Sequence, residues 1–225
     1  MAPKRARRAV SSSVQAGSTD SSSSGYGAIN FTTPEAQAEF TRLMGKSIAK
    51  ERGFLPSPAD GKLVEMIQSR GWESFCEAPA AVPLSIVREF YANAKAEQNG
   101  FSVVRGLTVD YTLEAIRRVI GGTEMRPTQD DWVRKNKRNM DLDRIIYYLC
   151  MPNTEWRRNP STNERLSFPA SAMNRYARAW NLFICANIMP STHTHEVTVD
   201  RAILLFGILT DEYVDIAYVL SLIHI

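Results

Sequence analysis

Two of the three histidines of the chain, His193 and His195, lie in the stretch "NIMPSTHTHEVTVDRAILLF", residues 187–206, with Glu196 directly after them. Side chains two positions apart converge on one metal ion only from an extended strand, whereas a helical metal pair needs a spacing of four, as in H-E-x-x-H. His224 lies almost at the terminus, and the cysteines form no C-x-x-C pair. The sequence therefore supplies no ligand set, and we expect no metal here.

A catalytic histidine would need a nucleophile or a substrate pocket beside it. The sequence shows neither a nucleophile-elbow glycine pattern nor a cysteine in a recognisable setting, and Gly121-Gly122 lacks the P-loop pattern. Thr198 and Asp200 have instead the types expected of a helix N-cap and an acidic first turn. We therefore expect His193 and His195 to lie in a connection between helices, and we expect no catalytic residue and no cofactor.

Aspartates are numerous enough to suggest an acidic nuclease or transposase triad. Such triads are usually mounted on a sheet, which this chain can hardly build, and most of these acids lie where helix caps need them. A remnant transposase or nuclease therefore stays an alternative, and the sequence favours a non-enzymatic protein. The aspartates concerned are Asp110, Asp130, Asp131, Asp141, Asp143 and Asp215.

Residues 132–178 interleave basic and aromatic side chains, with ten cations against four acids and hence a local charge of +6. In proteins that bind single-stranded nucleic acid, cations follow the phosphates and rings stack on the bases. The other interpretation is that the charges are solvated helix faces and the rings belong to the core. The candidate nucleic-acid-binding residues are Arg134, Lys135, Lys137, Arg138, Trp156, Arg157, Arg158, Arg175 and Arg178.

Caps and apolar spacing mark the helices that must position these residues. Thr33 is expected to be an N-cap because it directly precedes Pro34, and proline favours the first helical position. Asp141 or Asn139 is expected to cap "LDRIIYYLCM". Apolar residues step at three and four over residues 173–187, and residues 202–209 are apolar nearly all round, which predicts a central helix. The patterns predict a mainly α fold, a helical domain of roughly seven to nine helices.

A single stretch has a convincing β pattern. In "FSVVRGLTVDY", residues 101–111, β-branched residues flank Arg105-Gly106, which predicts one small β-hairpin with a tight turn. A lone hairpin is marginal by itself and must pack on helices. Residues 152–169 have a proline at each end and Pro160 between them, so we expect a loop there.

The charge of the chain is concentrated in its first residues. The 225 residues are 44% hydrophobic, enough for one domain with a core, and the formal net charge is +3. A candidate nuclear-import signal, Lys4, Arg5, Arg7 and Arg8, supplies +4 of it, and the alternative is a merely solubilising tail. Residues 11–24 hold eight serines, so we expect a disordered basic and Ser-rich tail over residues 1–30 before a helical domain over residues 31–225.

The sequence also bears on where the protein resides. No stretch approaches ~18 uninterrupted apolar residues, and the N-terminus lacks an apolar signal-peptide core, so we expect neither membrane insertion nor secretion. Cys76, Cys150 and Cys185 are odd in number and far apart, which favours free thiols in a reducing compartment. We expect an intracellular protein, nuclear or cytoplasmic.

Four landmarks appear in order along the chain: W-x-x-F in "RGWESFCEAP", E-F-Y-A-N in "VREFYANAK", V-R-G-x-x-V in "VVRGLTVDY", and H-x-x-E-V-T-x-x-R-A-x-L-L in "HTHEVTVDRAILL". In this order they resemble the plant transposon protein domain of retrotransposon-associated plant open reading frames, from about Gly53 to the C-terminus. That domain has no agreed catalytic residues, so the resemblance implies none here. Such proteins usually continue beyond Asp215-Ile216, which leads us to expect a domain truncated at its C-terminus.

The resemblance and the residues together favour a transposon-derived plant protein with a non-enzymatic domain for self-association or nucleoprotein assembly. Its expected partners are RNA or DNA and further copies of itself as a homo-oligomer. One alternative is a nucleic-acid-binding module that uses the basic-aromatic stretch 132–178. The other is the remnant transposase or nuclease.

Overall fold

The computed structural model describes residues 29–57, 60–97, 99–120, 132–136 and 139–223. Residues 1–28 of the tail expected over residues 1–30, the candidate import signal Lys4, Arg5, Arg7 and Arg8, and the candidate binding residues Lys137 and Arg138 lie outside these ranges. Within them the expected mainly α fold is confirmed. The helices are α1 Pro34–Met44, α2 Gly61–Ser69, α3 Leu84–Glu97, α4 Leu113–Ile120, α5 Trp132–Asn136, α6 Leu142–Leu149, α7 Arg175–Phe183, α8 Val199–Leu209 and α9 Ile216–Ile223.

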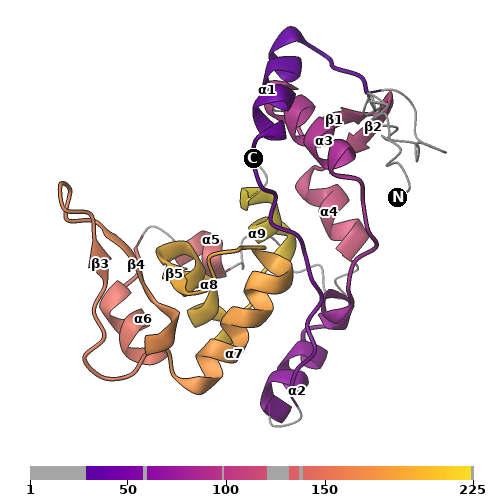
Figure 1. The fold of residues 1–225 in the computed structure, drawn as a ribbon. Helices are drawn as coiled ribbons and strands as arrows, with labels where there is room; N and C mark the ends of the chain where they lie inside the picture. The colour runs from indigo at the N-terminus through magenta and orange to yellow at the C-terminus, as the bar shows by residue number, and fades with distance from the viewer. Residues whose placement is uncertain (1–28, 58–59, 98, 121–131, 137–138, 224–225) are drawn as a thin grey trace, which may run out of the picture.

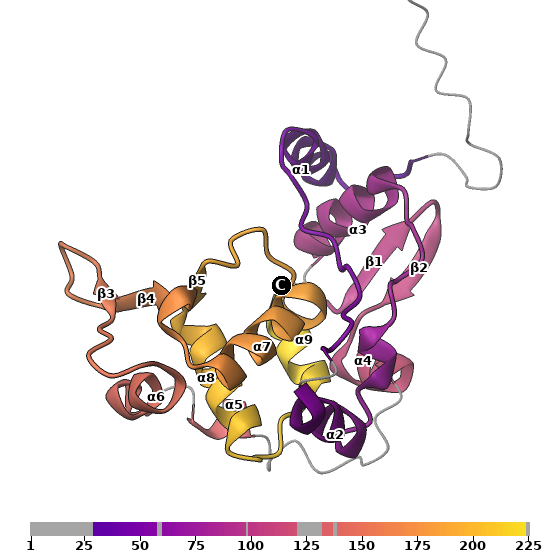
Figure 2. The same cartoon turned by 60° about the horizontal axis from the view of Figure 1, so that its bottom comes forward.

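The elements gather into two groups (Figures 1 and 2). One group contains α1, α3 and the hairpin of β1 (Phe101–Val104) and β2 (Leu107–Asp110), with α3 packed on both α1 and β1. The other contains α5 to α8, where α8 packs against α6 and α7. Helices α4 and α9 pack against each other between the two groups.

Polar caps begin α1 and α6 where the sequence indicates them. The Thr33 hydroxyl accepts the N–H of Ala36 at 3.1 Å, directly before Pro34. At α6 the cap is Asp141, whose carboxylate accepts two first-turn N–H groups at 3.1 Å. The nearly all-apolar helix α8 is buried along most of its length, as its pattern predicts. Local capping and burial of an apolar surface therefore explain these elements.

An aromatic cluster lies where α7 meets the segments before α3. Trp180 and Phe183 of α7 are fully buried, and Trp72 stacks on Phe183 with ring centroids 6.4 Å apart. Phe54 meets Phe183 edge to face at 5.5 Å. After Phe183 the helix widens into a buried π-helix, Ile184–Ile188. The cluster fixes the chain before α3 against the body of the domain.

A three-stranded antiparallel sheet is present in addition to the expected hairpin. It consists of β3 (Arg157–Arg158), β4 (Arg165–Pro169) and β5 (Glu196–Thr198), in the order β3-β4-β5. The expectation of a loop over residues 152–169 was therefore wrong at β3 and β4. Phe168 of β4 pairs with Val197 of β5, and both side chains are fully buried. Tertiary burial stabilises these strands, and β4 is buried at two consecutive residues and not in alternation.

The β1–β2 hairpin turns at Arg105 and Gly106, as expected from the sequence. Both residues have positive φ angles, 53° and 79°, which is the pattern of a type I′ turn. A non-glycine residue in this region is uncommon and costs about 1–3 kcal/mol, so other contacts must hold Arg105 in place.

Glu89 of α3 supplies those contacts. Its buried Oε1 accepts the backbone N–H of Arg105 at 2.7 Å and that of Asn30 at 2.9 Å. Its Oε2 lies 2.9 Å from the Arg105 Nε, an ion-pair contact without the alignment of a hydrogen bond. One turn later Asn93, also buried, donates to the carbonyls of Asn30 and Val103. The two side chains fasten the hairpin and the segment before α1 to α3.

We predict that Glu89→Ala lowers the free energy of unfolding by about 3 kcal/mol, because the change leaves buried donors and a half-enclosed guanidinium without their acceptor. Urea unfolding followed by circular dichroism measures the difference. Glu65→Ala, an exposed glutamate on α2, is the control and should change stability by no more than about 0.5 kcal/mol. Equal effects of the two substitutions would contradict the structural role of Glu89.

Candidate functional site

His193 and His195 lie in the exposed connection between the π-helix and β5, as expected. Their ring centroids are 5.9 Å apart. Over the described ranges no group of three His, Cys, Asp or Glu side chains is arranged to hold a metal ion. Thr198 occupies the N-cap position of α8 without a side-chain cap bond, and Asp200 lies in the first turn. The stretch is a link between elements.

Glu196, next to the histidines, is engaged in structural contacts. Its carboxylate pairs with Arg157 of β3, and its carbonyl accepts a hydrogen bond from the buried Arg201 at 2.8 Å. Both contacts hold the end of β5 to its neighbours. Glu196 is therefore occupied in fixing the connection and is poorly suited to act as a base for the histidines.

The aspartates of the hypothetical triad also have structural partners wherever the structure describes them. Asp215 pairs with Arg117 between α9 and α4, and Asp143 pairs with Arg165 at 2.6 Å. Asp110 accepts the N–H and hydroxyl of Thr112, and these bonds lower the pKa of its carboxyl. Asp141 caps α6, and Asp130 and Asp131 lie outside the described residues. Asp141 and Asp143 both lie at the start of α6, whereas Asp110 and Asp215 lie on other elements, and no three of the described aspartates form a cluster.

The free cysteines are poor candidates for nucleophiles. Cys150 and Cys185 are buried and Cys76 is partly buried. Burial raises the pKa of the Cys150 thiol to about 12 and raises that of the other two as well. Since the thiolate is the reactive form, the raised pKa values disfavour nucleophilic chemistry at these thiols.

The basic residues of the candidate nucleic-acid surface are spread over three elements. Arg134 and Lys135 lie on α5, and the Arg134 guanidinium lies 5.8 Å from the ring centroid of Tyr218 on α9. Arg157 and Arg158 lie on β3, in a hairpin that projects from the body in both views (Figures 1 and 2). Arg175 and Arg178 lie on α7. The fold thus distributes the described cations of this stretch over α5, β3 and α7.

Several of these cations are already matched by protein groups. Arg157 pairs with Glu196, and Arg175 lies 3.9 Å from Asp60. Arg158 and Arg178 donate to backbone carbonyls, those of Asn163 at 3.1 Å and Ser171 at 2.6 Å. Arg158 and Arg178 therefore have no carboxylate partner among the described residues, whereas the charges of Arg157 and Arg175 are partly neutralised.

Trp156 belongs to the core, which corrects its assignment as a base-stacking residue. Its side chain is only 7% exposed, its Nε1 donates to the Leu142 carbonyl at 3.0 Å, and its ring meets Phe168 edge to face. The most exposed ring among the described residues of this region is Tyr147 of α6, which is 87% exposed and lies one turn after Arg144, whereas Tyr148 is 46% exposed. Burial rather than residue type distinguishes the two rings, and periodicity within α6 is the signal that separates Tyr147 from the buried Ile146.

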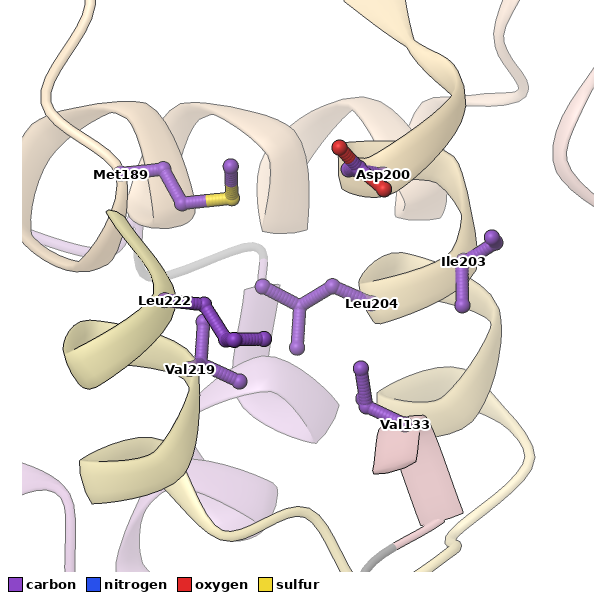
Figure 3. Close-up of a pocket in the computed structure, with 7 residues that line it drawn as sticks. All are labelled: Val133, Met189, Asp200, Ile203, Leu204, Val219 and Leu222. Atoms are coloured by element: carbon purple, nitrogen blue, oxygen red, sulfur yellow. The ribbon is translucent and has the colours of Figure 1, made fainter. Parts of the chain in front are cut away.

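A small apolar pocket lies between α5, α8 and α9 (Figure 3). Val219 and Leu222 face Leu204 across it, and Asp200 is its one acidic group. Its volume of about 70 Å³ is far below the ~300 Å³ of typical ligand pockets. It therefore has neither the room nor the polar groups to hold a nucleotide. The lining residues are Val133, Met189, Asp200, Ile203, Leu204, Val219 and Leu222.

These features define a helical domain whose described acidic residues serve mainly structural contacts. The family model "Putative plant retrotransposon-related domain" matches residues 68–223, more than two thirds of the chain. The chain belongs to this plant retrotransposon-related family, which confirms the resemblance seen in the sequence. No curated protein and no solved structure matches the chain. None of the helices in the described ranges is long and apolar enough to cross a membrane.

We predict that replacing both His193 and His195 by Asn changes the free energy of unfolding by less than about 1 kcal/mol, because both rings are exposed in a connection. The purified wild-type protein should contain no stoichiometric zinc, as measured by elemental analysis. Zinc bound one to one and lost in the double variant would instead establish a metal site.

Proposed function

We propose that this plant retrotransposon-related chain is a non-enzymatic assembly domain that associates with further copies of itself. The observation that carries the proposal is the exposure of strand β2. All four of its residues are exposed, and Leu107 keeps 71% of its surface. An uncovered strand with apolar side chains is a template for pairing with another chain.

The use of the polar residues supports an assembly role over catalysis. Glu89, Asn93 and Arg201 are buried and bonded to backbone groups of neighbouring segments. The Arg117–Asp215 pair joins α4 to α9. Active sites instead gather titratable groups in a cleft with room for a substrate. These contacts join neighbouring segments of the domain, and β2 lies exposed at its surface.

Binding of single-stranded nucleic acid is the second candidate function, and the exposed Tyr147 favours it. An exposed ring can stack on a base. Arg144 precedes it by one helical turn on α6, and Asn174 at the start of α7 donates to the carbonyl of the adjacent Tyr148. This places α7, which carries Arg178, beside the same end of α6. Arg144 and Arg178 are therefore the candidate phosphate contacts to accompany a base stacked on Tyr147.

We predict that the full-length protein, freed of nucleic acid, forms an oligomer whose mass in light scattering rises with protein concentration, because an open strand edge pairs by mass action. The ratio of absorbance at 260 and 280 nm verifies that nucleic acid is absent. A protein that stays monomeric up to the highest attainable concentration would refute the assembly function.

We predict that Tyr147 and Arg144 contribute in different ways to the binding of single-stranded RNA or DNA. Tyr147→Ala should weaken binding about tenfold with an unchanged salt slope, since stacking releases no counterions. Arg144→Ala should reduce the slope by about 0.7, the value for one phosphate contact. Fluorescence anisotropy at several salt concentrations measures both, with Tyr91→Phe as a control on α3. No salt-dependent binding by the wild type would eliminate this candidate.

A further inference from the structure

The outer edge of β2 follows from the register of the hairpin. Tyr111 N–H donates to the Gly100 carbonyl at 2.8 Å, and Val104 pairs with Leu107 beside the two-residue turn. Hydrogen-bonded pairs alternate with non-hydrogen-bonded pairs in an antiparallel ladder. Val103–Thr108 and Phe101–Asp110 are therefore the non-hydrogen-bonded pairs. The N–H and C=O groups of Thr108 and Asp110 point away from β1.

The two edges of the hairpin differ in what covers them. On the β1 edge, the Val103 carbonyl accepts the Asn93 side chain at 2.6 Å, and the Phe101 N–H donates to the Asn99 side chain at 2.9 Å. On the β2 edge, the backbone groups of Thr108 and Asp110 bond to no other described residue. Helix α3 thus closes one side of the hairpin and leaves the other side open.

Strand β2 also lacks the features that usually protect an edge. Its sequence, Leu-Thr-Val-Asp, contains no proline and no lysine, and its pairing with β1 runs without a bulge. Leu107 and Val109, which is 38% exposed, share one face of the strand. Natural sheets usually protect an open edge with charges, prolines or bulges. Here a single acidic residue at the end of the strand is the only such feature.

We propose that β2 pairs antiparallel with β2 of a second copy of this chain, which joins the two hairpins into a four-stranded sheet about a twofold axis. This inference rests on the proposed assembly function and specifies its surface. The axis passes beside Val109, so that Val109 lies opposite the same residue of the second copy. Thr108 of each copy then exchanges N–H···O=C bonds with Asp110 of the other, which satisfies the outward groups of both.

Side-chain chemistry selects this register over its neighbours. With the axis at Val109, the two valines form a non-hydrogen-bonded pair, where side chains approach most closely, and Leu107 lies opposite Tyr111. With the axis at Asp110, two carboxylates would lie opposite each other, and like charges directly opposite destabilise a sheet. With the axis at Thr108, Asp110 would lie opposite Gly106, which is in the turn and has no strand geometry.

The size of the contact determines its strength. A strand of four residues with few apolar side chains buries less than the ~1,200 Å² of a stable specific interface. The pair is therefore a reversible dimer that dissociates on dilution. Reversible pairing suits a unit that assembles only at high local concentration.

Cross-linking tests the register directly. In a non-hydrogen-bonded pair the Cα atoms lie ~4.5 Å apart, within the range for a disulfide. We expect the full-length Val109→Cys variant, treated with diamide as the two-electron oxidant, to form a covalent dimer on a non-reducing gel. Val119→Cys, at an 86% exposed position on α4, and the wild type with its native cysteines are the controls and should not cross-link comparably.

A backbone substitution tests the hydrogen bonds. Thr108→Pro removes an outward N–H while leaving the ladder to β1 intact, and we expect the dimer dissociation constant in sedimentation to rise about tenfold or more. Thr108→Val keeps the N–H and should leave the constant within about threefold. Circular dichroism verifies that both variants fold. If Thr108→Pro does not fold, the Val109→Cys cross-linking experiment decides whether β2 pairs with β2 of a second copy.

The outcomes separate the inference from the function beneath it. An oligomer that persists unchanged in Thr108→Pro and gives no specific cross-link at position 109 would overturn the β2 pairing and leave the assembly function standing. A wild-type chain that stays monomeric at every concentration would overturn both.

Discussion

The buried carboxylate of Glu89 is the interaction on which the hairpin region depends. It lies in α3 with no exposed surface, and it holds the Arg105 backbone in a left-handed conformation while facing its guanidinium. A buried charge is costly unless several donors satisfy it, and here two backbone N–H groups and one cation do so. Asn93 repeats the arrangement one turn later. Because both side chains bind the β1 side, the same contacts that secure the hairpin leave β2 facing outward.

The landmarks of the family resemblance coincide with such structural contacts. E-F-Y-A-N contributes Glu89 and Asn93, V-R-G contributes the positive-φ turn, and W-x-x-F contributes Trp72, which stacks in the aromatic cluster. In the last landmark, Arg201 is buried and bonds the carbonyl of Glu196. The landmarks thus specify how the segments are fastened together. Function in this chain is better sought on exposed surfaces than among the residues that identify the family.

Local rules predicted the elements that local forces stabilise. Thr33 and Asp141 cap their helices because a side-chain oxygen reaches N–H groups two or three residues on, which the sequence shows directly. The β3-β4-β5 sheet was missed because β5 is three residues long and is held by the burial of Phe168 against Val197, residues far apart in sequence. Trp156 was misplaced for the same reason. Its partners Leu142 and Phe168 come from two other elements, and composition alone cannot show which aromatic ring a fold encloses.

The positions of the two candidate surfaces bear on how an assembly would be organised. The β1–β2 hairpin and α6 lie at opposite ends of the molecule in both views (Figures 1 and 2). The α4–α9 contact, with its Arg117–Asp215 pair, lies between them. A strand paired at β2 would therefore not cover Tyr147, and a polymer bound along α6 would not block β2. Several copies bound to one nucleic-acid strand through α6 would have a raised local concentration of their β2 edges. A weak edge contact would then gain effective strength without any change in either interface.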